Sequence, residues 1–196
     1  MDDSRLNRIL GAATDLFSAR GFGGTTVQDV ADLANVSAGT VINYFKTKEN
    51  LLFILTRHII ESFYKQLFEI SRKHQDPANA LNEMLRSFTC FDLLDKKQLK
   101  IIFETDVFLC LDRTTFPYQD INMGIVKCKS LLEDLVTKCL KKNTASNYLA
   151  RDMAILYGSL FVGLGRMMAV DRLDLTIGDG FFNILNKCIC PNYFDE

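Results

Sequence analysis

A stretch of 28 residues, from Thr25 to Leu52, constrains the fold more than any other part of the chain. It contains two short amphipathic segments separated by a turn, and a longer amphipathic segment begins after them. Thr26 is a residue that favours helix N-caps, and Asn35 suits a helix end because asparagine tolerates the left-handed conformation. Ser37 suits the start of the next segment for the same reason as Thr26. The pattern predicts two short helices, a tight turn between them, and a long helix after them.

The spacing of apolar residues gives each short helix one buried side, because residues at i, i+3, i+4 and i+7 share a helix face. In the first helix these residues are Val27, Val30, Ala31 and Ala34. In the second helix the residues predicted to pack inward are Val41, Ile42 and Phe45. Those predicted to face outward are Thr40, Asn43 and Tyr44. A plain helical hairpin in an all-α core has the same spacing, so the pattern alone leaves that alternative open.

Short motifs along the first quarter of the chain match a known family pattern. They are Leu16-Phe17, Gly21-Phe22, Thr25-Thr26, Val30-Ala31, Ala34-Asn35-Val36-Ser37, Gly39-Thr40, Tyr44-Phe45 and Lys48-Glu49-Asn50-Leu51. With them, residues from about 5 to 52 resemble the DNA-binding domain of the TetR family of bacterial transcriptional regulators. Two positions depart from the family pattern. Asn35 replaces the usual Gly, and Ile42 replaces a Tyr that contacts the DNA backbone, so that contact is lost or moved to Tyr44 or Asn43.

The resemblance implies that the second short helix enters the major groove of double-stranded DNA. The helix starts at Thr26 and Ser37 offer backbone N–H groups to phosphates. Lys48 opens the long helix, where a cation is unfavourable to the helix dipole, and this small cost indicates another role such as a phosphate contact. The predicted DNA-binding residues are Thr26, Ser37, Ala38, Gly39, Thr40, Asn43, Tyr44, Lys46 and Lys48.

Charge limits how such a chain binds DNA. The chain has 196 residues and a formal net charge of −1. Residues 1–50 contain five bases and six acids, so this part also has a net charge of −1. Nucleic-acid-binding surfaces are usually basic. We therefore expect a protein that needs two copies to bind DNA usefully, rather than one that coats DNA nonspecifically.

Composition and pattern predict an all-α fold. The chain has only 3 Pro, and no stretch alternates apolar and polar residues convincingly. Apolar faces and breaks place later helices at 48–73, 77–91, 97–110, 118–142, 147–171 and 177–189. The resemblance implies this order of about nine helices. We expect residues 1–47 to form a three-helix helix-turn-helix DNA-binding domain, and residues 48–196 a helical ligand-binding and dimerisation domain.

Residues 153–168 are apolar nearly all round, so their helix must be covered on more than one side. Gly158, Gly163 and Gly165 permit the close approach of another backbone. One explanation is a central core helix of a monomer. The other is a helix at the twofold axis of a homodimer, which would set two recognition helices about 34–36 Å apart, as successive major grooves require.

The middle helices are rich in Phe, Met and Cys, and the resemblance implies a ligand cavity among them. Large apolar cavities with a few polar groups are typical of small-molecule sites. The predicted ligand-binding residues are Phe88, Phe91, Phe103, Phe108, Met123, Tyr157 and Arg166. For each aromatic residue the alternative is ordinary core packing. The predicted effector is apolar or aromatic.

Enzymatic and metal chemistry find little support in the sequence. His58 and His74 lie too far apart on one predicted helix to share a metal ion, and the six cysteines lack C-x-x-C spacing. We expect the thiols to be buried and reduced. Asp2 and Asp3 stand where a signal peptide would be basic, and no apolar run is long enough for a bilayer. We expect a cytoplasmic protein without membrane contact, which is not an enzyme and uses no cofactor or metal.

Two classes of function remain. The first is a ligand-responsive transcriptional regulator, most simply a repressor that binds a pseudo-palindromic operator as a dimer and is released by a small effector. The second is a small-molecule-binding or interaction protein on a regulator-like fold with an altered DNA role, an alternative that Ile42 and the acidic balance keep open. Strongly salt-dependent, sequence-specific DNA binding would separate the two classes.

Overall fold

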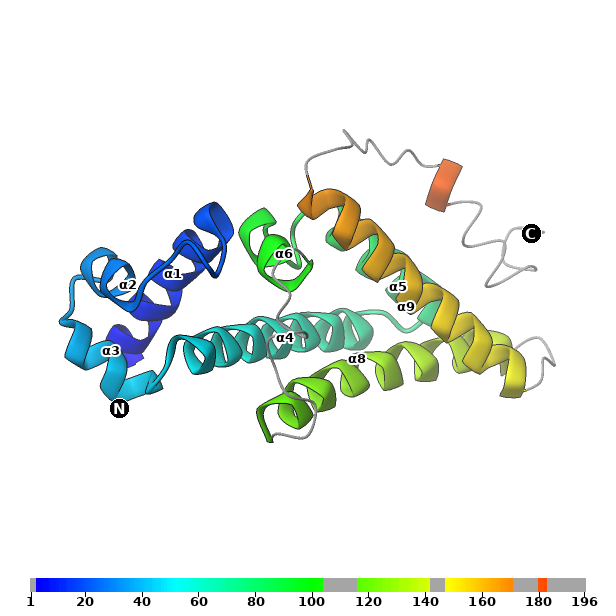
Figure 1. Cartoon of the computed structure of the whole chain (residues 1–196). Coiled ribbons are helices and arrows are strands. Elements are labelled where there is room, and N and C mark those ends of the chain that lie inside the picture. The colour runs from blue at the N-terminus through cyan, green and yellow to red at the C-terminus, as the bar shows by residue number, and fades with distance from the viewer. Residues whose placement is uncertain (1–2, 104–115, 142–146, 171–179, 183–196) are drawn as a thin grey trace.

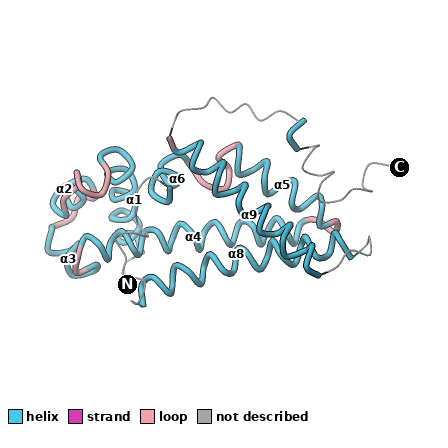
Figure 2. The backbone as a smooth tube through the Cα atoms, turned by 45° about the vertical axis from the view of Figure 1, so that its right-hand side comes forward, coloured by secondary structure: helices cyan, strands magenta, loops and turns pink. Residues whose placement is uncertain are grey.

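The computed structural model describes residues 3–103, 116–141, 147–170 and 180–182. All regular structure in these ranges is helical, which confirms the predicted all-α fold (Figure 1, Figure 2). The helices are α1 (Asp3–Arg20), α2 (Val27–Leu33), α3 (Ala38–Phe45), α4 (Lys48–Lys73), α5 (Pro77–Thr89), α6 (Lys96–Phe103), α8 (Phe116–Lys141) and α9 (Asn147–Ala169). Residues 180–182 add one helical turn.

The observed helices lie close to the predicted positions. The largest difference is at 97–110, where α6 is described as far as Phe103 and residues 104–110 lie outside the described part of the chain. Most of the predicted last helix, 177–189, also lies outside it. α8 begins at Phe116, two residues before its predicted start.

Short polar side chains fix where the first helices begin. Thr26 and Asp29 form a capping box at the start of α2, in which each side chain bonds the other residue's backbone N–H. Ser37 and Thr47 cap α3 and α4 by accepting the backbone N–H three residues on, each at 3.1 Å. Asn35 has φ 53°, which confirms the left-handed turn predicted between α2 and α3.

The first three helices pack together at one end of the molecule, and α4 leads from them into the remaining helices (Figure 1). α4 packs against α5 and α8, and α8 packs against α9. α6 contacts both α1 and α9 and therefore lies between the two parts of the chain. One cluster of buried apolar side chains runs from α1 through α9. Thr47 caps α4 at the expected domain boundary, but the division into two domains stays a prediction.

The apolar helix α9 packs against α6 and α8 yet leaves apolar residues on the surface. Leu156 and Val162 are 50% and 58% exposed. A side chain at Gly165 would place its Cβ 2.4 Å from the ring of Phe103 on α6, whereas Gly163 has no described atom nearby. The expectation that Gly165 opens the way to a second chain is therefore wrong, because its close neighbour belongs to the same chain. No helix in the described ranges is long and apolar enough to cross a membrane.

Candidate nucleic-acid interface and ligand cavity

The outer side of α3 is the surface that the sequence assigns to DNA. Val41 and Phe45 are each 1% exposed and fix the helix on the core. This register turns the opposite side of α3 toward solvent. Gly39, Thr40 and Asn43 lie there, and Ser37 is exposed at the helix start. Ala38, which was predicted to contact DNA, is half-buried and packs against the core, because it shares the helix face of Val41 and Phe45.

Ile42 and Tyr44 do not lie on their predicted sides. Ile42 was expected inside but is 49% exposed, because α3 packs on the core through the side that carries Val41 and Phe45. Tyr44 was expected outside but is half-buried and packs against the core, with its ring centroid 6.1 Å from that of Phe45. An apolar side chain thus faces outward at the position where the resemblance implies a Tyr.

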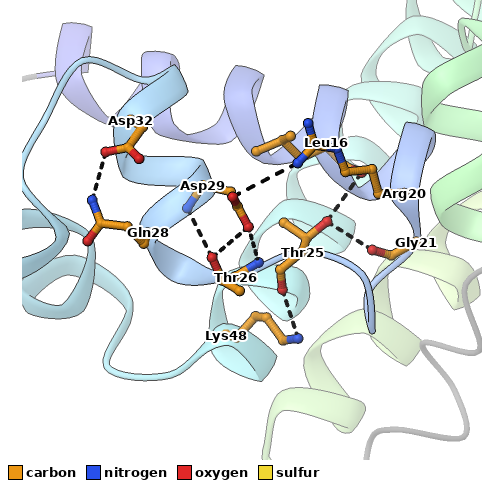
Figure 3. A network of polar contacts seen from close by, with 9 residues as sticks. All are labelled: Leu16, Arg20, Gly21, Thr25, Thr26, Gln28, Asp29, Asp32 and Lys48. Atoms are coloured by element: carbon orange, nitrogen blue, oxygen red, sulfur yellow. Dashed lines mark hydrogen bonds and ion pairs between the residues drawn. The ribbon is translucent and has the colours of Figure 1, made fainter.

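Two adjacent threonines hold the turn that precedes α2 (Figure 3). The buried Thr25 hydroxyl donates to the carbonyl oxygen of Gly21 at 2.9 Å, which ties the turn to the end of α1. The Thr26 hydroxyl donates to the Asp29 carboxylate at 2.6 Å. This bond, together with the Thr26 backbone N–H, keeps the pKa of Asp29 below its ordinary value. The Thr26 side chain is therefore hydrogen-bonded within the protein. Thr26 is available to DNA only through its position at the start of α2.

Lys48 fastens α4 to the same turn. Its ammonium donates to the carbonyl oxygen of Thr25 at 3.0 Å (Figure 3). It also donates to the carbonyl oxygen of Phe22 at 2.8 Å and lies 4.2 Å from the centroid of the Phe22 ring. Carbonyl dipoles from another segment thus offset the cost of a cation at a helix start. The structure gives Lys48 a structural role in place of the free phosphate-binding ammonium that was predicted.

Lys46 differs from Lys48 in being exposed. It ends α3 with φ 66°, and its side chain forms no ion pair or hydrogen bond within the described part of the chain. Its ammonium is therefore available to an external anion beside α3.

A second site lies between α4, α5, α6, α8 and α9, where the helices enclose a cavity of about 830 Å³. Its buried end is aromatic. The rings of Phe63, Phe88 and Phe161 meet edge to face, with centroids 4.9–6.2 Å apart. Sites for small organic ligands have volumes of about 300–1,000 Å³. The cavity therefore has the size and character of a small-molecule site.

Three of the residues predicted to bind a ligand, Phe88, Phe103 and Arg166, line this cavity. Phe108 lies outside the described residues. Sequence analysis did not single out Phe63 or Phe161, because each lies on the apolar face of a helix and periodicity alone marks it as core.

The other three predicted residues lie elsewhere, for different reasons. Phe91 follows the end of α5 with φ 63° and is 41% exposed. Met123 is 54% exposed on the surface of α8, away from the cavity. Tyr157 is 1% exposed and donates its hydroxyl to the Leu81 carbonyl oxygen at 2.6 Å, so it is a core residue that joins α9 to α5.

The thiols are less uniformly buried than predicted. Cys139 is buried, Cys128 is half-buried on the cavity wall, and Cys90 is exposed. Burial raises the pKa of Cys128 to about 11, so the thiol stays protonated at neutral pH and acts as a small apolar part of the wall. Among the described residues no three metal-ligating side chains gather in one place.

Known proteins resemble this chain in sequence and in fold. Residues 9–54 match the family described as bacterial regulatory proteins, tetR family. The transcriptional regulator HbdR from Aromatoleum sp. is 32% identical over 65 residues, which are 33% of this chain and 28% of HbdR. The transcriptional repressor KstR2 from Rhodococcus jostii is 23% identical over 132 residues, 63% of this chain and 64% of KstR2. The matches thus span less than two thirds of either relative.

The fold extends the match to nearly the whole chain. The crystal structure of AibR in complex with isovaleryl coenzyme A and operator DNA has a TM-score of 0.70 and 17% identity, covering 95% of this chain and 98% of AibR. HbdR and KstR2 are both named as transcriptional regulators, in agreement with the expectation that this chain is not an enzyme. Residues 9–54 therefore match the TetR family of bacterial regulatory proteins, and the chain as a whole has a fold similar to that of a TetR/AcrR-family regulator from Thermobifida fusca.

Proposed function

We propose that the protein is a transcriptional regulator that binds a pseudo-palindromic DNA operator as a homodimer. It acts as a repressor in the cytoplasm and is released from DNA by a small apolar or aromatic effector. The observation that carries this proposal is the presence, in one chain, of an exposed α3 face and a large apolar cavity. The first supports DNA binding, and the second supports a response to a ligand.

The proposed DNA contacts come from the outer side and the ends of α3. We assign Thr40 and Asn43 to base edges, because both lie on that side. Gly39 leaves room for the start of α3 to approach the DNA, and the backbone N–H groups at the starts of α2 and α3 suit phosphates. Lys46 supplies a free ammonium beside α3, and Lys48 positions the unit without contacting DNA itself.

A stripe along α9 supports the dimer. Leu156 and Met167 are 50% and 38% exposed, and Leu160 and Gly163 lie between them on the same helix face. No described atom lies within 4 Å of a Cβ placed on Gly163, which also lines the edge of the cavity, so this part of α9 is open. Two chains joined here would bring two α3 helices to one duplex, which compensates for the weak charge of each.

Helix α6 supports a link between ligand and DNA. Phe103 at its end lines the cavity, while the Lys97 ammonium near its start lies 2.6 Å from the Asp15 carboxylate on α1. A ligand that displaces Phe103 would move α6 against α1. Such a ligand acts only through its different affinities for the two arrangements. AibR, which shares the fold, carries an acyl-coenzyme A and operator DNA together, and so supports the proposal of one site for a ligand and another for DNA.

Selection of bound duplexes from a random DNA pool tests the proposal. We expect enrichment of a pseudo-palindrome whose affinity falls steeply as salt rises. Asn43→Ala should reduce the enrichment, whereas Asn122→Ala, at an exposed amide on α8, should not. If no sequence is enriched, the alternative of a ligand-binding or interaction protein with an altered DNA role takes precedence. The exposed Ile42 side chain on α3 is the observation that favours this alternative.

A further inference from the structure

The charges and apolar groups of the cavity are separated in space. Its buried end is formed by hydrocarbon side chains, including Phe88, Phe161 and Leu67, which are 1%, 7% and 0% exposed. Its exposed edge carries Lys129 from α8 and Arg166 from α9. We propose that the cavity binds an anionic amphiphile, a hydrocarbon chain that ends in an acidic head group. The inference rests on the proposed function only in naming this molecule as the effector.

The body of the ligand must be apolar along its length. Apart from the two cations, Ser159 and Cys128 carry the polar side-chain atoms among the described lining residues. The Ser159 hydroxyl already donates to the Ile155 carbonyl oxygen at 2.8 Å, and the Cys128 thiol is a weak partner. A ligand with polar groups along its body would leave them without hydrogen bonds inside the cavity, which opposes binding.

The head of the ligand must be an anion. Neither Lys129 nor Arg166 has an ion pair or hydrogen bond within the described chain, and no described lining residue is an acid. Several other cations of this protein, in contrast, have carboxylate partners. Such pairs are Arg57 with Asp120, Lys73 with Glu83, Lys97 with Asp15, and Lys138 with Asp134. Two unpaired cations from two helices at the edge of one apolar cavity complement a carboxylate or phosphate, and they would repel a cationic ligand.

A fluorescent fatty acid tests this directly. The probe is cis-parinaric acid, titrated beside its uncharged methyl ester, which keeps the same hydrocarbon chain. We expect the acid to bind more tightly than the ester. Lys129→Gln and Arg166→Gln should each weaken binding of the acid by about fivefold and leave binding of the ester unchanged. Lys127→Gln and Arg151→Gln are matched controls, because both residues are exposed on the same helices and do not line the cavity.

Competition then distinguishes two sources of such a head group. Displacement of the probe by palmitate indicates a free carboxylate, displacement by palmitoyl-coenzyme A alone indicates an acyl thioester, and either outcome supports an anionic head. Equal binding of acid and ester, equal losses in the control variants, or no binding of the acid would overturn the proposal. Operator selection is measured separately. A protein that selects an operator but fails these titrations keeps its proposed function and loses this ligand class.

Discussion

Lys48 offers the sharpest test of how the DNA-binding helices are held together. Lys48→Met removes the ammonium but keeps an apolar stem of similar length. The ammonium donates to two carbonyl oxygens, at 2.8 and 3.0 Å, and lies over an aromatic ring. Because the side chain is only half-buried, these contacts together are worth about 2 kcal/mol of unfolding free energy. For a chain of this size the loss lowers Tm by about 4–8 °C.

The assay pairs thermal unfolding with DNA binding measured over a series of salt concentrations. We expect Lys48→Met to lower Tm while the slope of log affinity against log salt stays unchanged. Lys46→Met is the matched control, because that ammonium is exposed and free. It should keep the wild-type Tm and flatten the slope by about one unit per chain. A Lys48→Met protein with wild-type Tm and a flatter slope would refute the structural role and restore the phosphate contact.

The remaining predictions concern packing, recognition and thiol chemistry. Gly165→Ala should destabilise the fold by about 1–3 kcal/mol through the clash with α6. Gly163→Leu should instead leave Tm unchanged and lower the dimer content measured by light scattering. Equal effects of the two variants would remove the distinction between the two glycines. Asn43→Ala should weaken specific DNA binding by about 1–3 kcal/mol without changing Tm, and unchanged affinity at fixed salt would take α3 out of the groove. At pH 8 an alkylating reagent should label Cys90 before Cys128, because the pKa of Cys128, about 11, leaves little thiolate. Peptide mass spectrometry would show the order of labelling. The reverse order would contradict the buried position of Cys128.

The helix boundaries could be predicted from the sequence because they depend on neighbouring residues. Thr26, Asn35 and Ser37 act on backbone groups within a few positions of themselves, so their residue types reveal the ends of α2 and α3. The side of a helix that becomes buried is harder to predict when apolar residues are adjacent in the sequence. Val41 and Ile42 are both β-branched and apolar, and only the packing of α3 against the core decides that Val41 is buried and Ile42 exposed.

Roles that depend on distant segments could not be predicted in the same way. The partners of Lys48 lie 23 and 26 residues before it, and no local pattern connects them. The ligand cavity is lined by residues from five helices, and no local pattern shows that Phe103 lines it and Tyr157 does not. In the structure Phe103 reaches the cavity wall, while the Tyr157 hydroxyl is used in a hydrogen bond to the α5 backbone.

The position of α6 explains how a small ligand can influence helices at the other end of the molecule. Gly165 leaves no space beyond the Phe103 ring, because even a Cβ there would lie 2.4 Å from it. A ligand that presses on Phe103 therefore cannot push it further into α9, and α6 as a whole must shift instead. Since α6 packs on α1 as well, that shift would reach α1, which packs against α2, and α2 in turn packs against α3. A difference in ligand affinity of about 100-fold between two such arrangements would change their ratio by the same factor, for example from about 10:1 to about 1:10.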